Sequence, residues 1–332
     1  MKLLLLFTLV ALGYSSHIGY SDEDEVQWEL FKIGYAREYG DKEDKTRKEI
    51  FMNNLNFIRC HNKKFEQGEV TFTVGVNQFA DWTSDEIHKL GGFRPPNIYY
   101  PRRRATEEFE IDENLEVPKT VDWRKKGAVT PVKDQGKCGS SYAFSATGSL
   151  EGQNYIKTEK LVSLSEQQLV DCSIFSEGCD GGVINGTFEY IKSAMGIEYE
   201  SSYPYEAQKG TCRRKLSEKV VDFIKYVDVT KGSEKALQQA VAKIGPISAL
   251  IDRRHQAFLL YKSGVYMEPA CSSQDLDHYV LVIGYGTTRN GEDFWLVKNS
   301  WGTSWGMRGY IMMARNHDNM CGIATQASYP TV

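Results

Sequence analysis

Residues 135–145 read Gln-Gly-Lys-Cys-Gly-Ser-Ser-Tyr-Ala-Phe-Ser and contain the strongest indication of the fold. Small and polar residues give way there to apolar residues that recur at helical spacing from Ala143 to Tyr155. The pattern predicts a helix that begins near Ser141. Because the dipoles at a helix N-terminus stabilise negative charge, Ser141 lies where a nucleophile would be favoured.

The same stretch resembles the active-site signature of the papain-like cysteine peptidases, in which Cys-Gly-Ser precedes the catalytic cysteine and an aromatic residue. Cys138 matches the first cysteine, but Ser141 occupies the nucleophile position. Tyr142 follows, where the family usually has tryptophan. The resemblance therefore implies a peptidase scaffold in which a hydroxyl replaces the thiol.

The resemblance extends to the other groups that peptide hydrolysis requires, which are a base, a group that orients it and an oxyanion hole. Gln135 matches the oxyanion glutamine, His278 the general base, and Asn299 the amide that orients the histidine. Trp301 would shield the hydrogen bond between His278 and Asn299 from water. Each residue alone has an ordinary structural explanation, whereas their order and spacing together support the resemblance.

The resemblance also implies a substrate cleft. Gly181 and Gly182 match the loop that pairs with the substrate backbone. An apolar pocket for the side chain two residues before the scissile bond would be lined by Val183, Ile184, Leu250 and Leu276. Tyr279 stands where the family usually has glycine or alanine, and it is expected to narrow or fill that pocket.

Two motifs near the N-terminus resemble the inhibitory prosegment of the cathepsin L-like subfamily. The first places six residues on one face of an expected helix: Glu43, Arg47, Phe51, Asn54, Ile58 and Asn62. Spacing alone would equally suit an ordinary amphipathic surface helix, but all six identities match. The second motif is also complete and consists of Gly75, Asn77, Phe79 and Asp81.

These features divide the chain into three parts. Residues 1–16 carry a positive start, a short apolar run and small residues, which indicates a secretory signal peptide. Residues 17–116 form the inhibitory prodomain and a linker, in which 93–116 is expected to be exposed. Its triple arginine, 102–104, is either a processing site or a solvated charge run. Residues 117–332 form the mature peptidase domain.

The order of helical and strand patterns indicates the fold class. Helical patterns dominate the first half of the mature part, and strand patterns recur at 247–251, 279–285, 294–297 and 310–313. Helices followed by antiparallel strands indicate an α+β fold. The resemblance specifies a papain-like two-lobe fold, with a helical lobe and a β-barrel-like lobe, preceded by the helical prodomain.

Composition limits the partners. A net charge of −4 gives no sign of a nucleic-acid or membrane partner, and after the N-terminal run no segment reaches 18 apolar residues. We expect a monomer in the secretory pathway, either extracellular or lysosomal. Its expected partners are a peptide or protein in the cleft and its own prodomain as an intramolecular inhibitor, and no cofactor is expected.

The cysteines are expected to form disulfides in this oxidising compartment. The six in the mature part allow 15 pairings in principle, of which the resemblance selects Cys138–Cys179, Cys172–Cys212 and Cys271–Cys321. Cys60 is left over. A zinc site is the competing interpretation, but the chain has no pair with C-x2-C spacing, so no metal is expected.

The serine leaves three functions open. A hydroxyl is far harder to ionise than a thiol, so the first is a cathepsin L-like homologue that binds peptides but has lost most or all proteolytic activity. The second is a weak serine-type endopeptidase that uses Ser141, His278 and Asn299. The third is a silica-condensing protein that resembles the silicateins. Asn185 also begins a sequon for glycosylation.

Overall fold

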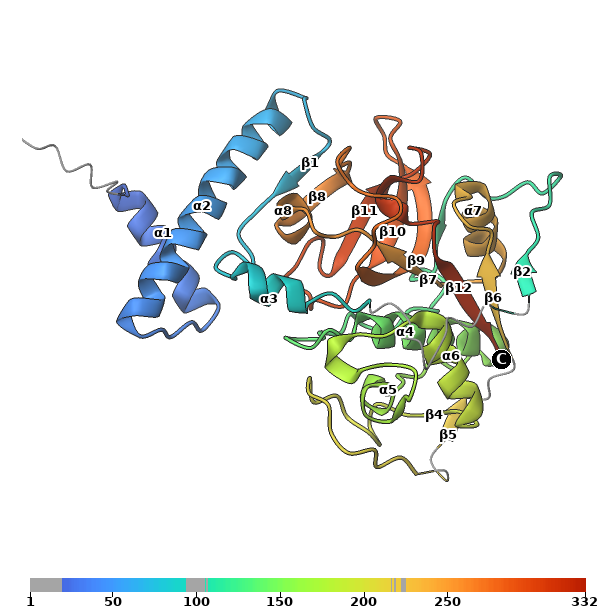
Figure 1. Cartoon of the computed structure of the whole chain (residues 1–332). Helices are drawn as coiled ribbons and strands as arrows, with labels where there is room; N and C mark the ends of the chain where they lie inside the picture. The colour runs from blue at the N-terminus through green and yellow to red at the C-terminus, as the bar shows by residue number, and fades with distance from the viewer. Residues whose placement is uncertain (1–19, 94–104, 106, 216, 218, 222–224) are drawn as a thin grey trace, which may run out of the picture.

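The computed structural model describes residues 20–93, 105, 107–215, 217, 219–221 and 225–332. The expected signal peptide and the triple arginine lie outside the described residues. Figure 1 shows an N-terminal helical group beside a sheet lobe, with a helical lobe below the sheet. Among the described residues, no helix has the length and apolar character needed to cross a bilayer.

The N-terminal group packs two helices around aromatic side chains. Its elements are α1 (Asp22–Gly34), α2 (Asp41–Glu66), β1 (Phe72–Val74) and α3 (Ser84–Lys89). Ser21 caps α1 with a reciprocal capping box. The buried rings of Trp28 and Phe51 lie 5.3 Å apart and join the two helices.

The helical lobe is built around α4 (Ser141–Thr158), which begins at Ser141 as the spacing predicted. The other elements of this lobe are α5 (Glu166–Cys172), η1 (Gly178–Asp180), α6 (Ile184–Ser193), β4 (Ile197–Glu198) and β5 (Lys219–Val221). Every residue of α4 from Ser141 to Asn154 is buried, so the helix forms the centre of the molecule and not a surface element. Ser165 caps α5 by accepting a hydrogen bond from the Gln168 amide at 3.0 Å.

The sheet lobe contains β3 (Val121–Asp122), β6 (Lys225–Val229), α7 (Glu234–Lys243), β7 (Ile247–Ile251), α8 (Gln256–Leu259), β8 (Tyr261–Tyr266), β9 (His278–Thr287), β10 (Asp293–Lys298), β11 (Tyr310–Ala314), η3 (Met320–Gly322) and β12 (Ala327–Thr331). The strand order is β1-β8-β11-β10-β9-β7-β12-β6-β2, with β3 also paired to β9. Central β9 is buried except at its last residue and packs on α4. The α+β fold with a helical prodomain is confirmed.

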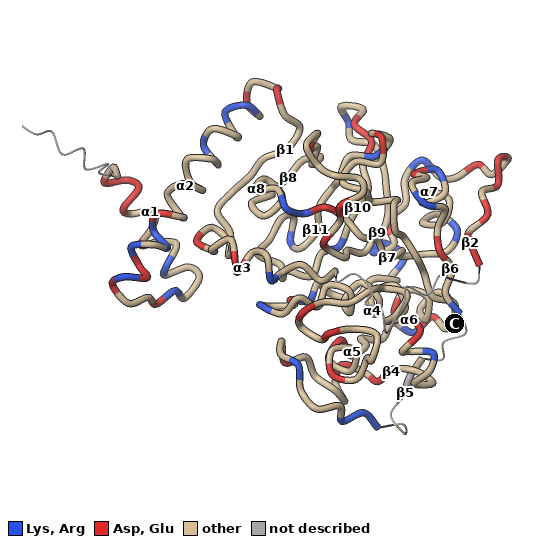
Figure 2. Tube along the Cα trace, viewed as in Figure 1, with Lys and Arg blue, Asp and Glu red and all other residues tan. Residues whose placement is uncertain are grey.

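The expectation that 93–116 forms only an exposed linker is wrong in part. Residues Glu107–Phe109 form strand β2, which pairs in parallel with β6 at the edge of the sheet. Phe109 is buried, with its ring 6.4 Å from Tyr329. Figure 2 shows the acidic residues that follow β2 beside the basic residues of α7, and Lys235 pairs with Glu113. Apolar burial and strand pairing therefore hold a segment whose sequence lacks periodicity.

Candidate active site

Ser141 lies fully buried at the first position of α4. Its Oγ accepts a hydrogen bond from the backbone N–H of Tyr279 at 3.1 Å. Within the described residues this is the hydroxyl's one hydrogen bond, and none joins it to the imidazole of His278. The sequence therefore correctly placed Ser141 at the helix start, but its proton is not yet in contact with a base.

His278 begins β9 and is held by Asn299, which follows β10. The distance from His278 Nε2 to Asn299 Oδ1 is 2.8 Å, and the Ser300 amide donates to the same oxygen at 2.8 Å. Because that oxygen only accepts, Nε2 carries the proton and Nδ1 is the basic atom of the neutral ring. The ring of Trp301 lies 4.9 Å from the imidazole and covers it.

The environment of His278 favours its neutral form. Burial and then the positive charge of Arg253 lower the pKa of His278 to about 3, although hydrogen bonds to Asn299 and to the Leu90 backbone oppose the shift. A neutral imidazole can accept a proton from a hydroxyl, whereas the imidazolium of a thiolate pair is disfavoured here.

Gln135 presents its amide N–H groups to the cleft. Its Oε1 accepts from the Ser300 hydroxyl at 2.7 Å, which fixes the orientation of the amide. Its Nε2 donates to the Cys138 carbonyl at 2.8 Å and to the Leu90 carbonyl at 3.1 Å. A prosegment carbonyl thus occupies the place that the sequence assigned to an oxyanion.

The prosegment crosses the cleft through two glycines. Gly91 and Gly92 follow α3, and a Cβ atom added to Gly92 would overlap Ser141 Oγ. The amide of Gly182 donates to the Gly92 carbonyl at 3.0 Å, and Phe93 forms a parallel bridge with Gly182. The loop that was predicted to pair with a substrate backbone therefore pairs with the prosegment.

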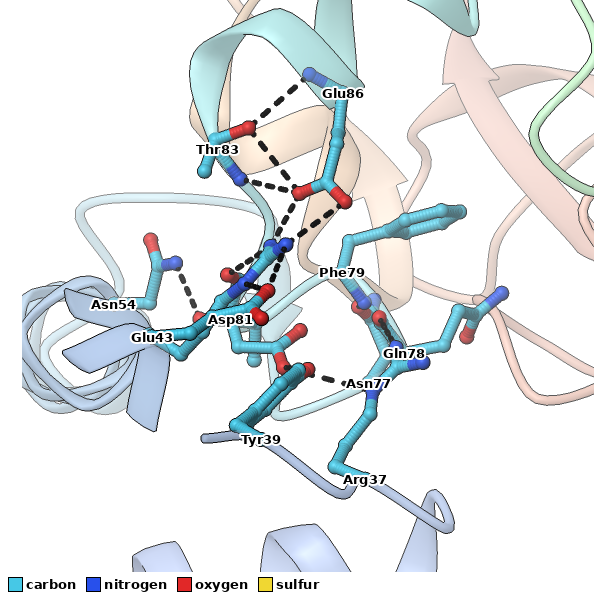
Figure 3. Close-up of polar contacts among 12 residues, drawn as sticks. Arg37, Tyr39, Glu43, Asn54, Asn77, Gln78, Phe79, Asp81, Thr83 and Glu86 are labelled. Atoms are coloured by element: carbon cyan, nitrogen blue, oxygen red, sulfur yellow. Dashed lines mark hydrogen bonds and ion pairs between the residues drawn. The ribbon is translucent and has the colours of Figure 1, made fainter. Parts of the chain in front are cut away.

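Both prosegment motifs form the contacts that hold this segment in place (Figure 3). Arg47 on α2 donates to Glu86 on α3 at 3.0 Å and to the Asp81 carbonyl at 3.1 Å. The Asp81 carboxylate is buried against Tyr39 and lies 3.5 Å from Arg37. Burial raises the pKa of Asp81. Burial opposes ionisation of Glu86 as well, but hydrogen bonds and charge from Arg47 outweigh it and lower the pKa of Glu86 to about 2.

The cavity beside Phe93 differs from the apolar pocket that the sequence predicted. Val183, Ile184 and Tyr279 line it, whereas Leu250 and Leu276 do not and belong to the same buried apolar cluster as Tyr279. The Tyr279 hydroxyl accepts from the Ile184 amide at 3.2 Å, which links the sheet lobe to the helical lobe. The expected lining by Leu250 and Leu276 is therefore not found in this cavity of the zymogen.

The side chain of Asn185, which begins the expected sequon, is only 3% exposed. Its Nδ2 donates to the Asp228 carboxylate at 3.2 Å, and its Oδ1 accepts from the Ser328 hydroxyl at 3.2 Å. Because this side chain is buried and hydrogen-bonded, we expect the sequon to stay unmodified in the folded protein.

The structure contains all three expected disulfides. Cys138–Cys179 ties the segment before α4 to η1 and so holds Gly181 and Gly182 beside Ser141. Cys60 is an exposed free thiol. Among the described residues, the one group spaced to hold a metal is Asp252, His255 and Cys271, but the sulfur of Cys271 is already in a disulfide.

Sequence reasoning missed Arg253, which lies 2% exposed between the prosegment and the cleft. Its Nη2 donates to the Ile87 carbonyl of α3 at 2.8 Å, and its Nε lies 3.3 Å from Asp277. Two adjacent arginines, Arg253 and Arg254, follow the predicted strand 247–251, and this was the one indication in the sequence of a functional cation there. The local sequence does not show that Arg253 is buried against the prosegment.

Comparison with known proteins agrees with this geometry. The family described as "Papain family cysteine protease" matches residues 117–331, and "Cathepsin propeptide inhibitor domain" matches residues 28–87. Digestive cysteine proteinase 2 of Homarus americanus is 51% identical, with 92% of this chain and 94% of that protein covered. Procathepsin L of Rattus norvegicus is 45% identical, with 99% of each covered.

Among solved structures, digestive procathepsin L 3 of the Tenebrio molitor larval midgut superposes with a TM-score of 0.84 at 41% identity, covering 94% of this chain and 100% of that one. The chain belongs to the papain family of cysteine proteases. Its prodomain and its relatives place it among the cathepsin L-like zymogens.

Proposed function

We propose that this zymogen releases a domain that binds peptides in its cleft and that has lost most or all proteolytic activity. The observation that carries the proposal is the oxygen of Ser141 at the start of α4, at the position where papain-like enzymes have the catalytic thiol. In papain-like enzymes the thiol reaches a pKa of about 3–4 beside a histidine and a helix N-terminus. A serine hydroxyl does not form a stable anion in the way that this thiol forms a thiolate.

The partner of the base supports this proposal. Serine peptidases use a buried carboxylate to stabilise the imidazolium that forms when histidine takes the serine proton. Here Asn299 supplies a neutral oxygen, which stabilises the imidazolium less than a carboxylate would, and the positive charge of Arg253 disfavours it. Proton transfer from Ser141 to His278 therefore gains little.

A weak serine-type endopeptidase is the second candidate. It is favoured by the neutral His278, whose Nδ1 is the basic atom, and by Gln135, whose amide is already directed into the cleft. The oxyanion hole and binding alone retain roughly 10³–10⁴-fold catalysis over water in serine peptidases that lack a working triad. Activity of this second kind would depend on Ser141.

We infer that residues 1–16 direct export to an extracellular or lysosomal destination, that 17–116 inhibit the cleft until they are removed, and that 117–332 act as the mature domain. The test uses protein processed to remove residues 17–116, a panel of fluorogenic peptides, and the variants Ser141→Ala and Ser141→Cys. We expect wild type and Ser141→Ala to hydrolyse the fluorogenic peptides at the same background rate and to bind labelled peptides. We expect Ser141→Cys to hydrolyse the fluorogenic peptides. Wild-type turnover that Ser141→Ala abolishes would establish the second candidate instead.

A further inference from the structure

The cavity beside Phe93 has a carboxylate in its lining. Phe93 packs its ring 6.2 Å from Tyr279 and bridges Gly182, so this cavity is the side-chain subsite next to the backbone-pairing loop. The residues of the mature domain that line it include Val183, Ile184, Tyr279, Ala327, Ser328 and Asp228. Asp228 comes from β6, and Ser328 from the neighbouring strand β12.

Asp228 is bonded only to neutral donors within the described residues. The Asn185 amide donates to it at 3.2 Å, the Ser328 hydroxyl donates to Oδ1, and the Ala105 backbone N–H donates to Oδ2 at 3.2 Å. Lys231 lines the same cavity, but no ion pair joins these two described residues. Because no ion pair offsets the charge of this carboxylate, it can attract a cation into the partly buried cavity.

Removal of the prosegment changes this cavity directly. Phe93 and Glu108 both line it, and Ala105 supplies one of the hydrogen bonds to Asp228. All three belong to the part that processing would remove. The mature cleft then gains the space of Phe93, loses the negative charge of Glu108, and leaves Asp228 with an unused acceptor.

Apolar attraction in the same subsite is limited. Leu250 and Leu276 do not line it, and Tyr279, which does, is only 1% exposed. The other apolar residues of the mature domain in its lining are Val183, Ile184, Val229 and Ala327, and beside a carboxylate they suit the methylene stem of a long cationic side chain.

We propose that the processed protein selects peptides with a cationic side chain, lysine or arginine, in this subsite, where the cation pairs with Asp228. The inference rests on the proposed function, because it requires that the cleft bind peptides. The carboxylate recognises the charge, while Val183 and Ile184 contact the stem.

The test measures binding of three labelled peptides to processed wild type by fluorescence anisotropy. The peptides differ at one position, which carries arginine, its neutral isostere citrulline, or leucine. A hydrogen-bonded ion pair in a partly buried site corresponds to roughly tenfold in affinity, so arginine should bind about tenfold more tightly than citrulline. Asp228→Asn should abolish that difference, since it keeps the shape and the bonds to Asn185 and Ser328.

Asp318→Asn is the matched control, because Asp318 is exposed, does not line the cavity, and has a positive φ that asparagine tolerates. It removes the same charge and should leave the arginine preference unchanged. Thermal unfolding checks that each variant folds, and the comparison of arginine with citrulline in wild type needs no variant. Equal binding of those two peptides, tighter binding of leucine, or a preference that survives Asp228→Asn overturns the inference. Absence of binding by all three peptides overturns the proposed function as well.

Discussion

The carbonyl oxygen of Leu90 lies 3.1 Å from Nε2 of Gln135, the amide that the sequence assigned to the oxyanion hole. Two residues later, Gly92 lies against Ser141 with no room for a side chain. The prosegment therefore blocks both the donor and the nucleophile position with backbone atoms, and inhibition depends on how closely that backbone approaches.

Gly92→Ala should weaken the inhibitory contact. The added Cβ would overlap Ser141 Oγ, so the prosegment has to move away from the cleft. We expect full-length Gly92→Ala to unfold at a lower temperature than wild type and to bind peptide before processing, while the processed proteins are identical because residue 92 is gone. Gly68→Ala is a control for substitution at a prosegment glycine whose added Cβ meets nothing within 4 Å, although its φ of +72° carries its own strain. Unchanged unfolding and no peptide binding by full-length Gly92→Ala would contradict the steric account.

Acid should destabilise the zymogen more than the processed protein. The folded pKa of His278, about 3, lies below its ordinary 6.5, so its contribution is complete above pH 6.5 and is lost as pH falls toward 3. Glu86 acts in the same direction: its folded pKa of about 2 lies below its ordinary 4.5, so its contribution to stability is lost as the pH falls through that range. For each proton, the free energy of unfolding changes by at most about 1.4 kcal/mol per pH unit. Thermal unfolding measured from pH 7 to about pH 2 covers the ranges of both groups.

Two comparisons sharpen that experiment. Glu86→Gln should reduce the pH dependence of zymogen stability only at the acid end of the range, because the His278 contribution remains. Processing should reduce the pH dependence of stability between pH 6.5 and 4.5, because removal of Leu90 and its neighbours exposes the imidazole to water. Identical pH dependence of the zymogen and the processed protein would show that burial by the prosegment does not control His278.

Tyr279→Gly should open the apolar part of the subsite. The change joins the space behind the ring to the cavity beside Val183 and Ile184, so processed protein should gain binding of peptides with leucine at that position. Loss of a buried aromatic side chain costs about 3–5 kcal/mol, which chemical denaturation would detect.

Tyr279→Phe separates the ring from its hydroxyl. It keeps the ring and loses the bond to the Ile184 amide, at a cost of about 1 kcal/mol, and should not change peptide preference. If Tyr279→Phe admits leucine as well as Tyr279→Gly does, the ring is not the barrier.

Asn185 should carry no glycan when the protein is made in a secretory host. Its amide is buried and bonded to Asp228, so folding competes with modification. Peptide mapping by mass spectrometry should find unmodified Asn185, and treatment with a glycosidase should not shift the mass. A glycan on most molecules at this residue would mean that the side chain turns outward.

The features that the sequence predicted well depend on neighbours along the chain. The start of α4 at Ser141 and the face of α2 that carries Arg47 and Asn54 follow from residue spacing, which acts within one or two turns. The sequence did not indicate strand β2 or the burial of Leu250, Leu276 and Asn185, because burial there depends on segments that meet across the fold.

The chemistry of this protein can be read from its residues: an oxygen at residue 141, an amide partner for His278, and two complete inhibitory motifs. Which groups those atoms meet depends on the folded chain. Tyr279 reaches across to Ile184, Asp228 turns toward the cleft, and Leu90 lies on Gln135. The physical reason is that side-chain identity and helical periodicity are local properties, whereas burial and pairing are settled when segments distant in sequence pack together.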